Sequence, residues 1–180
     1  NLVSTDKPYA LVLATKTGHD GESTNLTSPN GLSQKNLIKA CLEKAKLQPN
    51  QIDFIECHGT GTPLGDPIEV HALRDVFGKN RSSPLYLTTI KANIGHTESA
   101  AGVAGLIKTI LCFQNKQIPP LPELESVNPN FNLRNAQFSF PKELVQLGPD
   151  QTRAGISSFG ASGVISHAVL ESVKVKRERV

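Results

Sequence analysis

The segment Ile52-Asp53-Phe54-Ile55-Glu56-Cys57, which runs directly into His58-Gly59-Thr60-Gly61-Thr62, decides the fold class of this chain. Its first half alternates as a β-strand does, and its second half is a glycine-rich loop. The next segment, Asp66-Pro67-Ile68-Glu69, predicts a helix start with Asp66 as cap, proline at the first helical position and Glu69 completing a capping box. The order strand, loop and helix places His58 at the carboxyl end of a strand, where α/β sheets present ligand sites.

The same order returns further along the chain. A predicted strand over Leu85–Ile90 leads into Lys91-Ala92-Asn93-Ile94-Gly95-His96, and a helix follows from Glu98 to Gln114. This helix is rich in alanine and glycine, which allow close packing, so we expect it to be central and buried. The spacing of the two histidines allows their strands to be parallel neighbours.

The remaining elements complete an α/β pattern. A helix is predicted over Gln34–Lys46 with Ser33 as its N-cap. The predicted β-segments are a buried strand over 9–15, a short strand over 136–140, and a hairpin formed by Ala154–Phe159 and Val164–Glu171. Strands and helices alternate first and a hairpin closes the chain, which predicts a mixed β-sheet with layered helices.

Composition narrows the class of protein and its partners. The 180 residues are 38% hydrophobic and 19% charged, with a net charge of +3, which fits one globular domain or one lobe of a larger domain. No basic stripe interleaved with aromatics predicts nucleic-acid binding, and no apolar run is long enough to predict a membrane span. The three widely spaced cysteines form neither a metal pair nor a disulfide framework, which favours a reducing, cytoplasmic compartment.

The two glycine-flanked histidines are the candidates for chemistry. Two imidazoles at neighbouring strand ends can donate hydrogen bonds to one developing oxyanion. Lys91 and Glu98 are near enough in sequence to pair across the second loop and orient His96. Each histidine taken alone is equally well explained as an ordinary loop or capping residue, and the Lys91–Glu98 pair as a surface salt bridge. The repetition of the unit favours the functional interpretation.

Other candidate sites are weaker. A Cys57–His58 nucleophile pair conflicts with the opposite directions of consecutive strand side chains, so Cys57, Cys41 and Cys112 are predicted to be core residues. A zinc site built from His58, His96 and a cysteine has no recognised spacing. The other histidines are interpreted as structural or exposed: His19, His71 and His167. No nucleophile completes the site, so the histidines predict half of an active site.

Long motifs carry a family resemblance. The segment from Glu56 to Glu69 resembles the first histidine motif of β-ketoacyl synthases, specifically the ketosynthases of modular polyketide synthases and type I fatty acid synthases. The segment from Lys91 to Gly102 resembles the second motif, and the loop from Asp20 to Gly31 and the turn from Gly155 to Gly160 resemble further family features. The resemblance implies the C-terminal half of a thiolase-like fold over residues 1–172, followed by a basic tail or linker start over 173–180.

The resemblance also implies a reaction and partners. Ketosynthases catalyse a decarboxylative Claisen condensation between an acyl thioester and a malonyl-type extender carried on the phosphopantetheine arm of an acyl carrier protein. No directly bound cofactor or metal is implied. The implied partners are the N-terminal half of the same domain, which carries the nucleophilic cysteine, the acyl carrier protein and a second copy in a homodimer.

Residue roles follow from the matching positions. The resemblance implies that His58 and His96 donate hydrogen bonds to the enolate, that Lys91 holds the imidazole arrangement and that Glu98 anchors Lys91. The implied substrate-binding residues are Thr60, Thr62, Asn93, Phe159, Gly160 and Ala161.

One segment departs from the family pattern. Ala161 replaces a bulky gate residue, and Val164-Ile165 replaces a polar Thr-Asn pair. A smaller gate would admit a wider acyl chain, whereas loss of the polar pair would slow the chemistry. Two alternative functions therefore stay open: a non-elongating ketosynthase-like module that binds or transfers acyl thioesters, and a structural lobe for dimerisation or docking.

Overall fold

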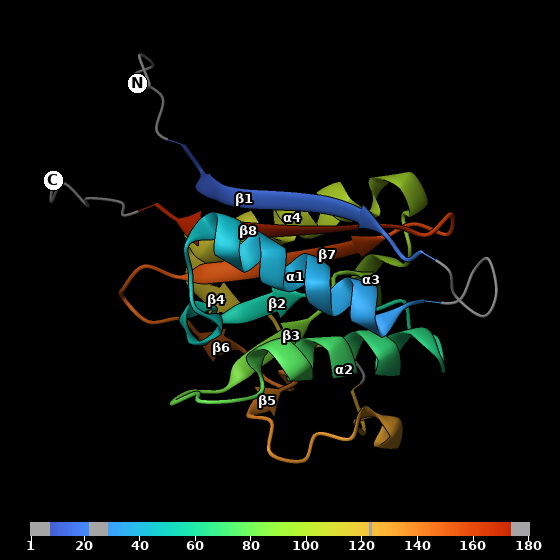
Figure 1. The fold of residues 1–180 in the computed structure, drawn as a ribbon. Coiled ribbons are helices and arrows are strands. Elements are labelled where there is room, and N and C mark those ends of the chain that lie inside the picture. The colour runs from blue at the N-terminus through green and yellow to red at the C-terminus, as the bar shows by residue number, and fades with distance from the viewer. Residues whose placement is uncertain (1–7, 22–28, 123, 174–180) are drawn as a thin grey trace, which may run out of the picture.

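A six-stranded mixed sheet forms the centre of the molecule. The computed structural model describes residues 8–21, 29–122 and 124–173, and Figure 1 shows its elements. The strands lie in the order β1 (Ala10–His19), β8 (Val164–Ser172), β7 (Arg153–Phe159), β2 (Phe54–Glu56), β3 (Leu85–Thr88) and β5 (Phe138–Ser139). The β1, β8 and β7 strands pair antiparallel, whereas β7, β2, β3 and β5 run parallel. The predicted mixed sheet and closing hairpin are confirmed.

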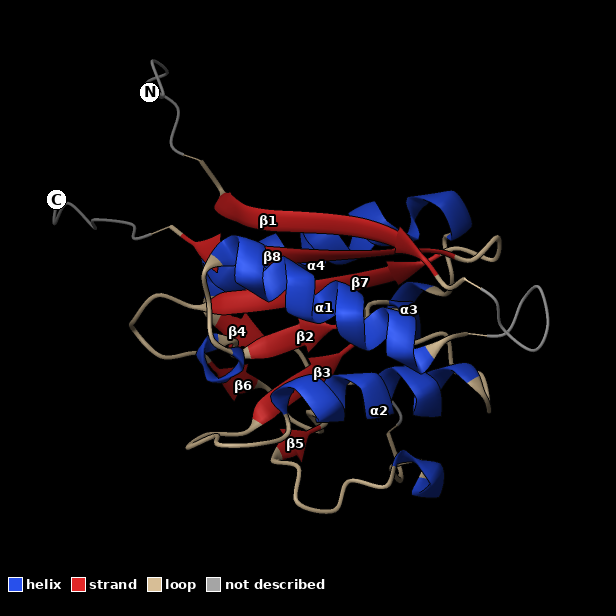
Figure 2. Ribbon diagram, viewed as in Figure 1, coloured by secondary structure: helices blue, strands red, loops and turns tan. Residues whose placement is uncertain are grey.

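Helices cover both faces of this sheet. Two of them, α1 (Gly31–Ala45) and α2 (Gly65–Phe77), lie on one face, and α4 (Ala101–Asn115) lies on the other (Figure 2). The short elements are η1 (Pro49–Gln51), α3 (Lys91–Ile94), η2 (Glu98–Ala100), η3 (Pro129–Phe131) and a two-stranded sheet of β4 (Gln117–Ile118) and β6 (Val145–Gln146). The carboxyl ends of β2 and β7 point to the side where α1 begins and α3 lies, which is to the right in Figure 1.

The first strand differs from its prediction. The sequence predicts a buried strand over 9–15, but β1 continues to His19 and only Ala14 in it is buried. The reason is its position: β1 is the edge strand and pairs only with β8 among the described strands. Local apolar runs do not distinguish an edge strand from a central one, and β2 shows the contrast because all three of its residues are buried.

The predicted helix caps are wrong in both long front helices. Asn30, not Ser33, caps α1: its side-chain oxygen accepts the backbone N–H groups of Leu32 and Ser33 at 3.0 and 3.2 Å. The Ser33 hydroxyl instead donates to the Asp20 carbonyl at 3.0 Å. Leu64 stands at the N-cap of α2 and makes no side-chain cap. The two acids predicted to cap α2 therefore serve another part of the molecule.

The helix α4 is buried on one face only. Its inner face packs on the sheet, and a Cβ at Gly105 would lie 3.0 Å from the Glu56 side chain. Its outer face carries Val103, Ile107 and Leu111, each 50 to 54% exposed in this chain. The prediction of a buried helix is thus confirmed for the face of α4 that packs on the sheet, whereas the opposite face is exposed.

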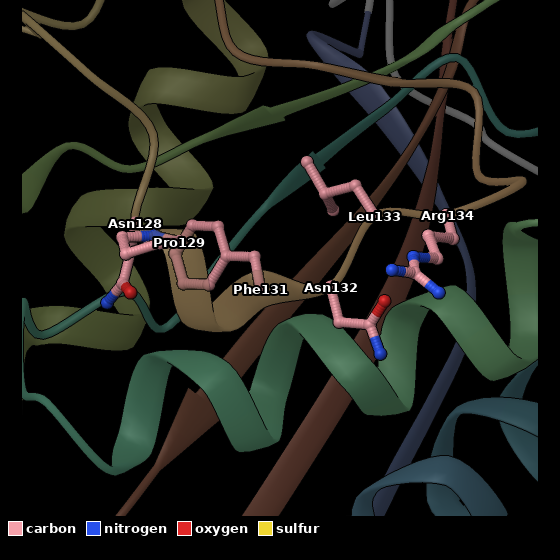
Figure 3. Close-up of a pocket in the computed structure, with 6 residues that line it drawn as sticks. All are labelled: Asn128, Pro129, Phe131, Asn132, Leu133 and Arg134. Carbon is pink, nitrogen blue, oxygen red and sulfur yellow. The ribbon is translucent and has the colours of Figure 1, made fainter.

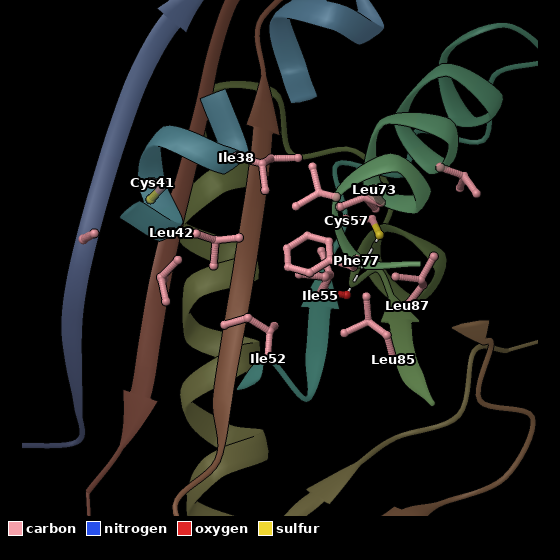
Figure 4. Packing of buried hydrophobic residues seen from close by; sticks show 14 of the residues in the cluster. Ile38, Cys41, Leu42, Ile52, Ile55, Cys57, Leu73, Phe77, Leu85 and Leu87 are labelled. Atoms are coloured by element: carbon pink, nitrogen blue, oxygen red, sulfur yellow. Dashed lines mark hydrogen bonds between the residues drawn. The ribbon is translucent and has the colours of Figure 1, made fainter. Parts of the chain in front are cut away.

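Two apolar clusters lie on opposite faces of the sheet. The cluster beneath α1 and α2 includes Ile38, Cys41, Ile55, Cys57 and Phe77, several of which Figure 4 labels. The cluster beneath α4 includes Phe54, Cys112 and Phe113. All three cysteines are buried and unpaired, which confirms their prediction as core residues.

The centre of the sheet tolerates no additional atom at Gly155. A Cβ there would lie 2.6 Å from Ile55 Cδ1 and 2.9 Å from the His167 ring, and both side chains are buried. We expect Gly155→Ala to lower the free energy of unfolding by about 1–3 kcal/mol, measured by urea denaturation. Gly148→Ala is the matched control, since no described atom lies within 4 Å of its Cβ position. Equal stability of the two variants would contradict the packing described for Gly155.

Candidate active site

The fold brings the two predicted histidines together. The parallel pairing of β2 with β3 places the loops after both strands side by side, and the His58 and His96 ring centroids lie 5.5 Å apart at an interplanar angle of 80°. The Phe159 ring, at the end of β7, lies 5.1 Å from the His58 ring. Residues from three separate parts of the sequence thus meet at one edge of the sheet.

Backbone hydrogen bonds define which nitrogen of each imidazole carries the proton. The Phe159 N–H donates to His58 Nδ1 at 3.3 Å, and the Glu98 N–H donates to His96 Nδ1 at 2.9 Å. Since each Nδ1 accepts, the proton of the neutral ring lies on Nε2. Both imidazoles therefore present an Nε2–H donor.

Burial keeps His58 neutral. Its pKa is lowered to about 4, first by desolvation and then by electrostatic interactions with Lys91 and His96. At neutral pH the ring is an uncharged hydrogen-bond donor, the kind of group that can stabilise a developing oxyanion.

Two carboxylates hold the loop that follows β2. Glu69 accepts the backbone N–H groups of His58 and Gly59 at 2.8 and 2.9 Å, and Asp66 accepts the Gly61 N–H at 3.0 Å. Gly59 has φ +48°, and a Cβ there would lie 2.9 Å from Thr89 Cβ. The acids predicted as a capping box thus belong to the histidine loop, because its turned-in amides need acceptors that the loop does not supply.

A buried charged cluster holds the second loop. Glu56, at the end of β2, accepts the Ile90 N–H at 2.6 Å and the Thr88 hydroxyl at 2.7 Å. The Lys108 ammonium, from α4, lies 2.6 Å from the same carboxylate. These contacts fix the chain just before α3 and His96.

The predicted Lys91–Glu98 pair does not form. Lys91 is half-buried and its charge interacts with Glu69 and Glu56, while burial lowers its pKa overall. Glu98 is exposed, and its contribution to the site is its backbone N–H at φ +49°. Sequence proximity favours the pairing, but Lys91, the first residue of α3, lines a cavity together with Asp66 and Glu69.

A pocket of about 450 Å³ opens in front of the histidines. The predicted residues that line it are His58, His96, Thr60, Thr62, Phe159, Gly160 and Ala161. Lys91 lines a neighbouring cavity of about 410 Å³ that shares Thr60, Asp66 and Glu69 with the pocket. Asn93 is exposed and lines neither cavity, and neither does Glu98.

The structure adds residues that sequence reasoning missed. Glu69, Glu56 and Lys108 are not among the predicted site residues, although a charged residue inside an apolar strand or helix is a recognisable signal of a buried polar contact. Two further buried polar side chains, Asp20 and Gln34, line the pocket.

Other features of the described residues offer no competing centre. A hollow of about 600 Å³ lies at η3, lined by Phe131, Arg134 and their neighbours, and Figure 3 shows that none of its six lining residues is a histidine, cysteine or carboxylate. In the described part of the chain no three metal-ligating side chains are grouped, and no helix is long and apolar enough to cross a membrane. No described cysteine lines the pocket, and burial raises the pKa of the Cys41 and Cys112 thiols to about 11.

Glu69 makes stability depend on pH. Burial raises its pKa from 4.5 to about 7, so the folded protein binds more protons than the unfolded chain between these values, and stability is lost as pH rises through them. Relative to Glu69→Gln, which cannot titrate, the wild type should lose about 3 kcal/mol from pH 4.5 to pH 7. Urea unfolding across this range measures the difference, with exposed Glu43→Gln as control. Parallel stability curves for wild type and Glu69→Gln would contradict the assignment.

Known proteins are similar to this chain in sequence. The family model "Beta-ketoacyl synthase, C-terminal domain" matches residues 9–125. The chain is 42% identical over 171 residues to one subunit of the phenolphthiocerol/phthiocerol polyketide synthase of Mycobacterium tuberculosis, covering 92% of this chain and 9% of that protein. It is 41% identical over 175 residues to the highly reducing polyketide synthase azaB of Aspergillus niger, covering 95% of this chain and 7% of that protein.

Solved structures share the fold. The oxazolomycin ketosynthase domain OzmH KS7 of Streptomyces albus superposes with a TM-score of 0.89 at 33% identity, covering 96% of this chain and 31% of that one. The ketosynthase from module 6 of the bacillaene synthase of Bacillus subtilis 168 gives 0.89 at 34% identity, covering 96% and 33%. The chain therefore spans less than a tenth of these curated relatives and about a third of these ketosynthase chains.

The mixed sheet with helices on both faces and its paired loop histidines define the C-terminal half of a thiolase-like fold. More particularly, the chain belongs to the β-ketoacyl synthase family and is homologous to the ketosynthase domains of polyketide synthases.

Proposed function

We propose that this chain is the enolate-stabilising half of a ketosynthase that performs decarboxylative Claisen condensation. The observation that carries the proposal is the arrangement of His58 and His96, 5.5 Å apart, each with Nδ1 bound to a backbone N–H and Nε2–H left as donor. An oxyanion needs preorganised hydrogen-bond donors, and this arrangement supplies two at one edge of the sheet.

The proposed chemistry follows from these donors. In a malonyl thioester the bond to the carboxylate breaks, carbon dioxide leaves, and its electron pair moves onto the thioester carbonyl to form an enolate. The two Nε2–H groups stabilise the enolate oxygen, each by about 3 kcal/mol. The enolate carbon then attacks the acyl thioester on a cysteine of the N-terminal half, the new carbon–carbon bond forms, and the cysteine leaves as a thiolate.

The substrates enter along the other lining residues. Thr60 and Thr62 bear hydroxyls on the pocket wall and would contact the phosphopantetheine arm of an acyl carrier protein, in polyketide or fatty acid synthesis. Phe159, Gly160 and Ala161 would line the acyl pocket and its gate, where the small Ala161 leaves room for a wide acyl chain. Lys91 and Glu98 act on the histidines from outside this pocket, Lys91 through its charge and Glu98 through its backbone. Asn93 lies outside the lining of the pocket, so we assign it no contact with the substrate there.

The proposed partners complete the site. The exposed apolar face of α4, formed by Val103, Ile107 and Leu111, is the surface that the N-terminal half would cover within a homodimeric domain. We infer that residues 1–172 form the lobe, because β8 ends at Ser172. Most of the proposed tail over 173–180 lies outside the described residues.

One observation favours a second candidate function. Ile165 is fully buried in the core and Val164 is 43% exposed, so neither replaces the hydrogen bonds of a polar pair. A ketosynthase-like module that holds or transfers acyl thioesters without condensation would need no such pair. The full domain distinguishes the two: a cysteine nucleophile and carbon–carbon bond formation support condensation, whereas acyl transfer without condensation supports the second candidate.

The chain alone should not condense thioesters. All three of its cysteines are buried and none lines the pocket, so no nucleophile can carry the acyl group. Incubation of the chain with acyl and malonyl thioesters, followed by mass spectrometry, is expected to show no β-ketoacyl product. The full domain serves as the positive control. Product formed by the chain alone at the rate of the full domain would overturn the proposed division of the site.

A further inference from the structure

Two buried polar side chains face the histidine pocket without a described partner. Gln34, on the first turn of α1, is 1% exposed, and neither its Nε2 nor its Oε1 has a hydrogen-bond partner among the described residues. Asp20, just after β1, is 9% exposed, and its Oδ1 likewise has none among them. Both residues line the pocket of about 450 Å³ that contains His58 and His96.

Such groups are costly unless a ligand or solvent satisfies them. A buried amide without hydrogen bonds destabilises a protein by about 1–3 kcal/mol, so a pocket that holds three such atoms is suited to a polar ligand. Three hydrogen bonds hold the backbone of Asp20 in place. The Asp20 carbonyl accepts the Asn30 side-chain N–H at 2.9 Å and the Ser33 hydroxyl at 3.0 Å, and the Asp20 N–H donates to the Gly163 carbonyl at 2.8 Å.

The polar atoms specify what kind of group they bind. Gln34 supplies donors and an acceptor, and Asp20 supplies an acceptor, so a matching group must both donate and accept. The group bound next to the Asp20 carboxyl is not an anion, because Asp66 and Glu69 also line the pocket and no lysine or arginine is among its described lining residues. The matching group is therefore uncharged, such as an amide or a hydroxyl.

We propose that Gln34 and Asp20 form a polar subsite that binds an uncharged donor–acceptor group of the thioester substrate. The group is an amide of the carrier arm or a hydroxyl of the acyl chain, which share this hydrogen-bonding chemistry. The inference rests on the proposed function, since it takes the thioester to be the occupant of the pocket. Gln34 positions the substrate opposite the two histidines and takes no part in bond breaking.

The test uses the full ketosynthase domain and three small thioesters. Butyryl-N-acetylcysteamine carries an amide, the butanethiol thioester of 3-hydroxybutyrate carries a hydroxyl, and the butanethiol thioester of butyrate carries neither. The kcat/KM for acylation of the domain is measured by mass spectrometry for wild type, Gln34→Leu and Gln34→Met. Thr109→Val is the matched control, because Thr109 Oγ1 is also buried without a described partner but lies outside the pocket lining.

A selective loss supports the subsite. Both Gln34 variants should lower kcat/KM about tenfold for the amide or the hydroxyl thioester, and the one affected identifies the bound group. The thioester with neither group should react unchanged, and Thr109→Val should react as wild type with all three. The thermal midpoint of the Gln34 variants should not fall, since no described contact is lost.

Two results would overturn the subsite. One is an equal loss on all three thioesters, which indicates a structural role, and the other is no loss on any of them. Calorimetric binding of pantetheine, which carries both amides and hydroxyls, separates this inference from the proposed function. Suppose that the wild type is not acylated but binds pantetheine more tightly than Gln34→Leu. This result supports the polar subsite and refutes the proposed condensation. If both bind pantetheine equally, no thioester shows a selective loss and the wild type condenses normally, the subsite is refuted and the proposed function is retained.

Discussion

Replacing either histidine by alanine in the full ketosynthase domain is expected to slow carbon dioxide release from a malonyl thioester by about 10²–10³-fold. Each replacement removes one Nε2–H donor from the enolate oxygen, and loss of a single oxyanion donor typically has this effect on turnover. The measurement is release of labelled carbon dioxide under saturating substrate, with acylation of the cysteine followed separately. In His58→Ala and His96→Ala, the rate of cysteine acylation should fall less, relative to wild type, than the rate of decarboxylation.

A conservative replacement sharpens this test. Asparagine can offer a side-chain N–H donor in place of imidazole, so His58→Asn should retain more decarboxylation than His58→Ala. His71→Ala is the matched control, because His71 bonds the Asn130 carbonyl at 3.1 Å, away from the pocket lining. Unchanged carbon dioxide release in both alanine variants would refute the oxyanion role of the pair.

The pH dependence of the same reaction follows from His58. Its lowered pKa of about 4 means that the neutral donor persists well below the usual titration range of histidine. Carbon dioxide release should therefore not show a loss assignable to His58 as pH falls from 7 to 5.5. A general base with an ordinary histidine pKa would instead lose activity in this range.

Sequence patterns are sufficient for the order of elements and for the main site. Strand ends and glycine loops are local features, so the two units carrying His58 and His96 can be recognised and placed side by side from their repetition. The closing hairpin is also local. The roles of these residues in the reaction remain proposals, because the geometry shows where they lie and not what they bind.

The errors have a common physical cause. The Lys91–Glu98 pair and the capping box are inferred from closeness in sequence, but Lys91, Asp66 and Glu69 interact with other groups and Glu98 is exposed. Glu69 accepts two backbone N–H groups of a tight loop, and Lys91 is held near buried acids. The edge position of β1 depends on which strands pair, and local periodicity does not contain that information.

Breaking the buried ion pair between Lys108 and Glu56 should have the largest effect on stability. The two side chains are 8 and 2% exposed, and their charged atoms lie 2.6 Å apart. Lys108→Met leaves the Glu56 carboxylate buried without its counter-charge, which typically lowers the free energy of unfolding by about 3–5 kcal/mol. Urea denaturation at constant pH measures the loss. Lys35→Met is the matched control, since the Lys35–Asp75 pair is 28 and 41% exposed and a surface pair contributes about 0–1 kcal/mol.

The double variant separates stability from function at this cluster. Lys108→Met combined with Glu56→Gln removes both charges, so a large part of the lost stability should return. Glutamine has a single acceptor oxygen in place of the two carboxylate oxygens that bind the Ile90 N–H and the Thr88 hydroxyl, so the chain before His96 is held less firmly. The double variant should therefore fold well and still release carbon dioxide more slowly than wild type in the full domain. Full recovery of both properties would show that Glu56 does not position His96, and a Lys108→Met loss no larger than that of Lys35→Met would show that the pair is not effectively buried.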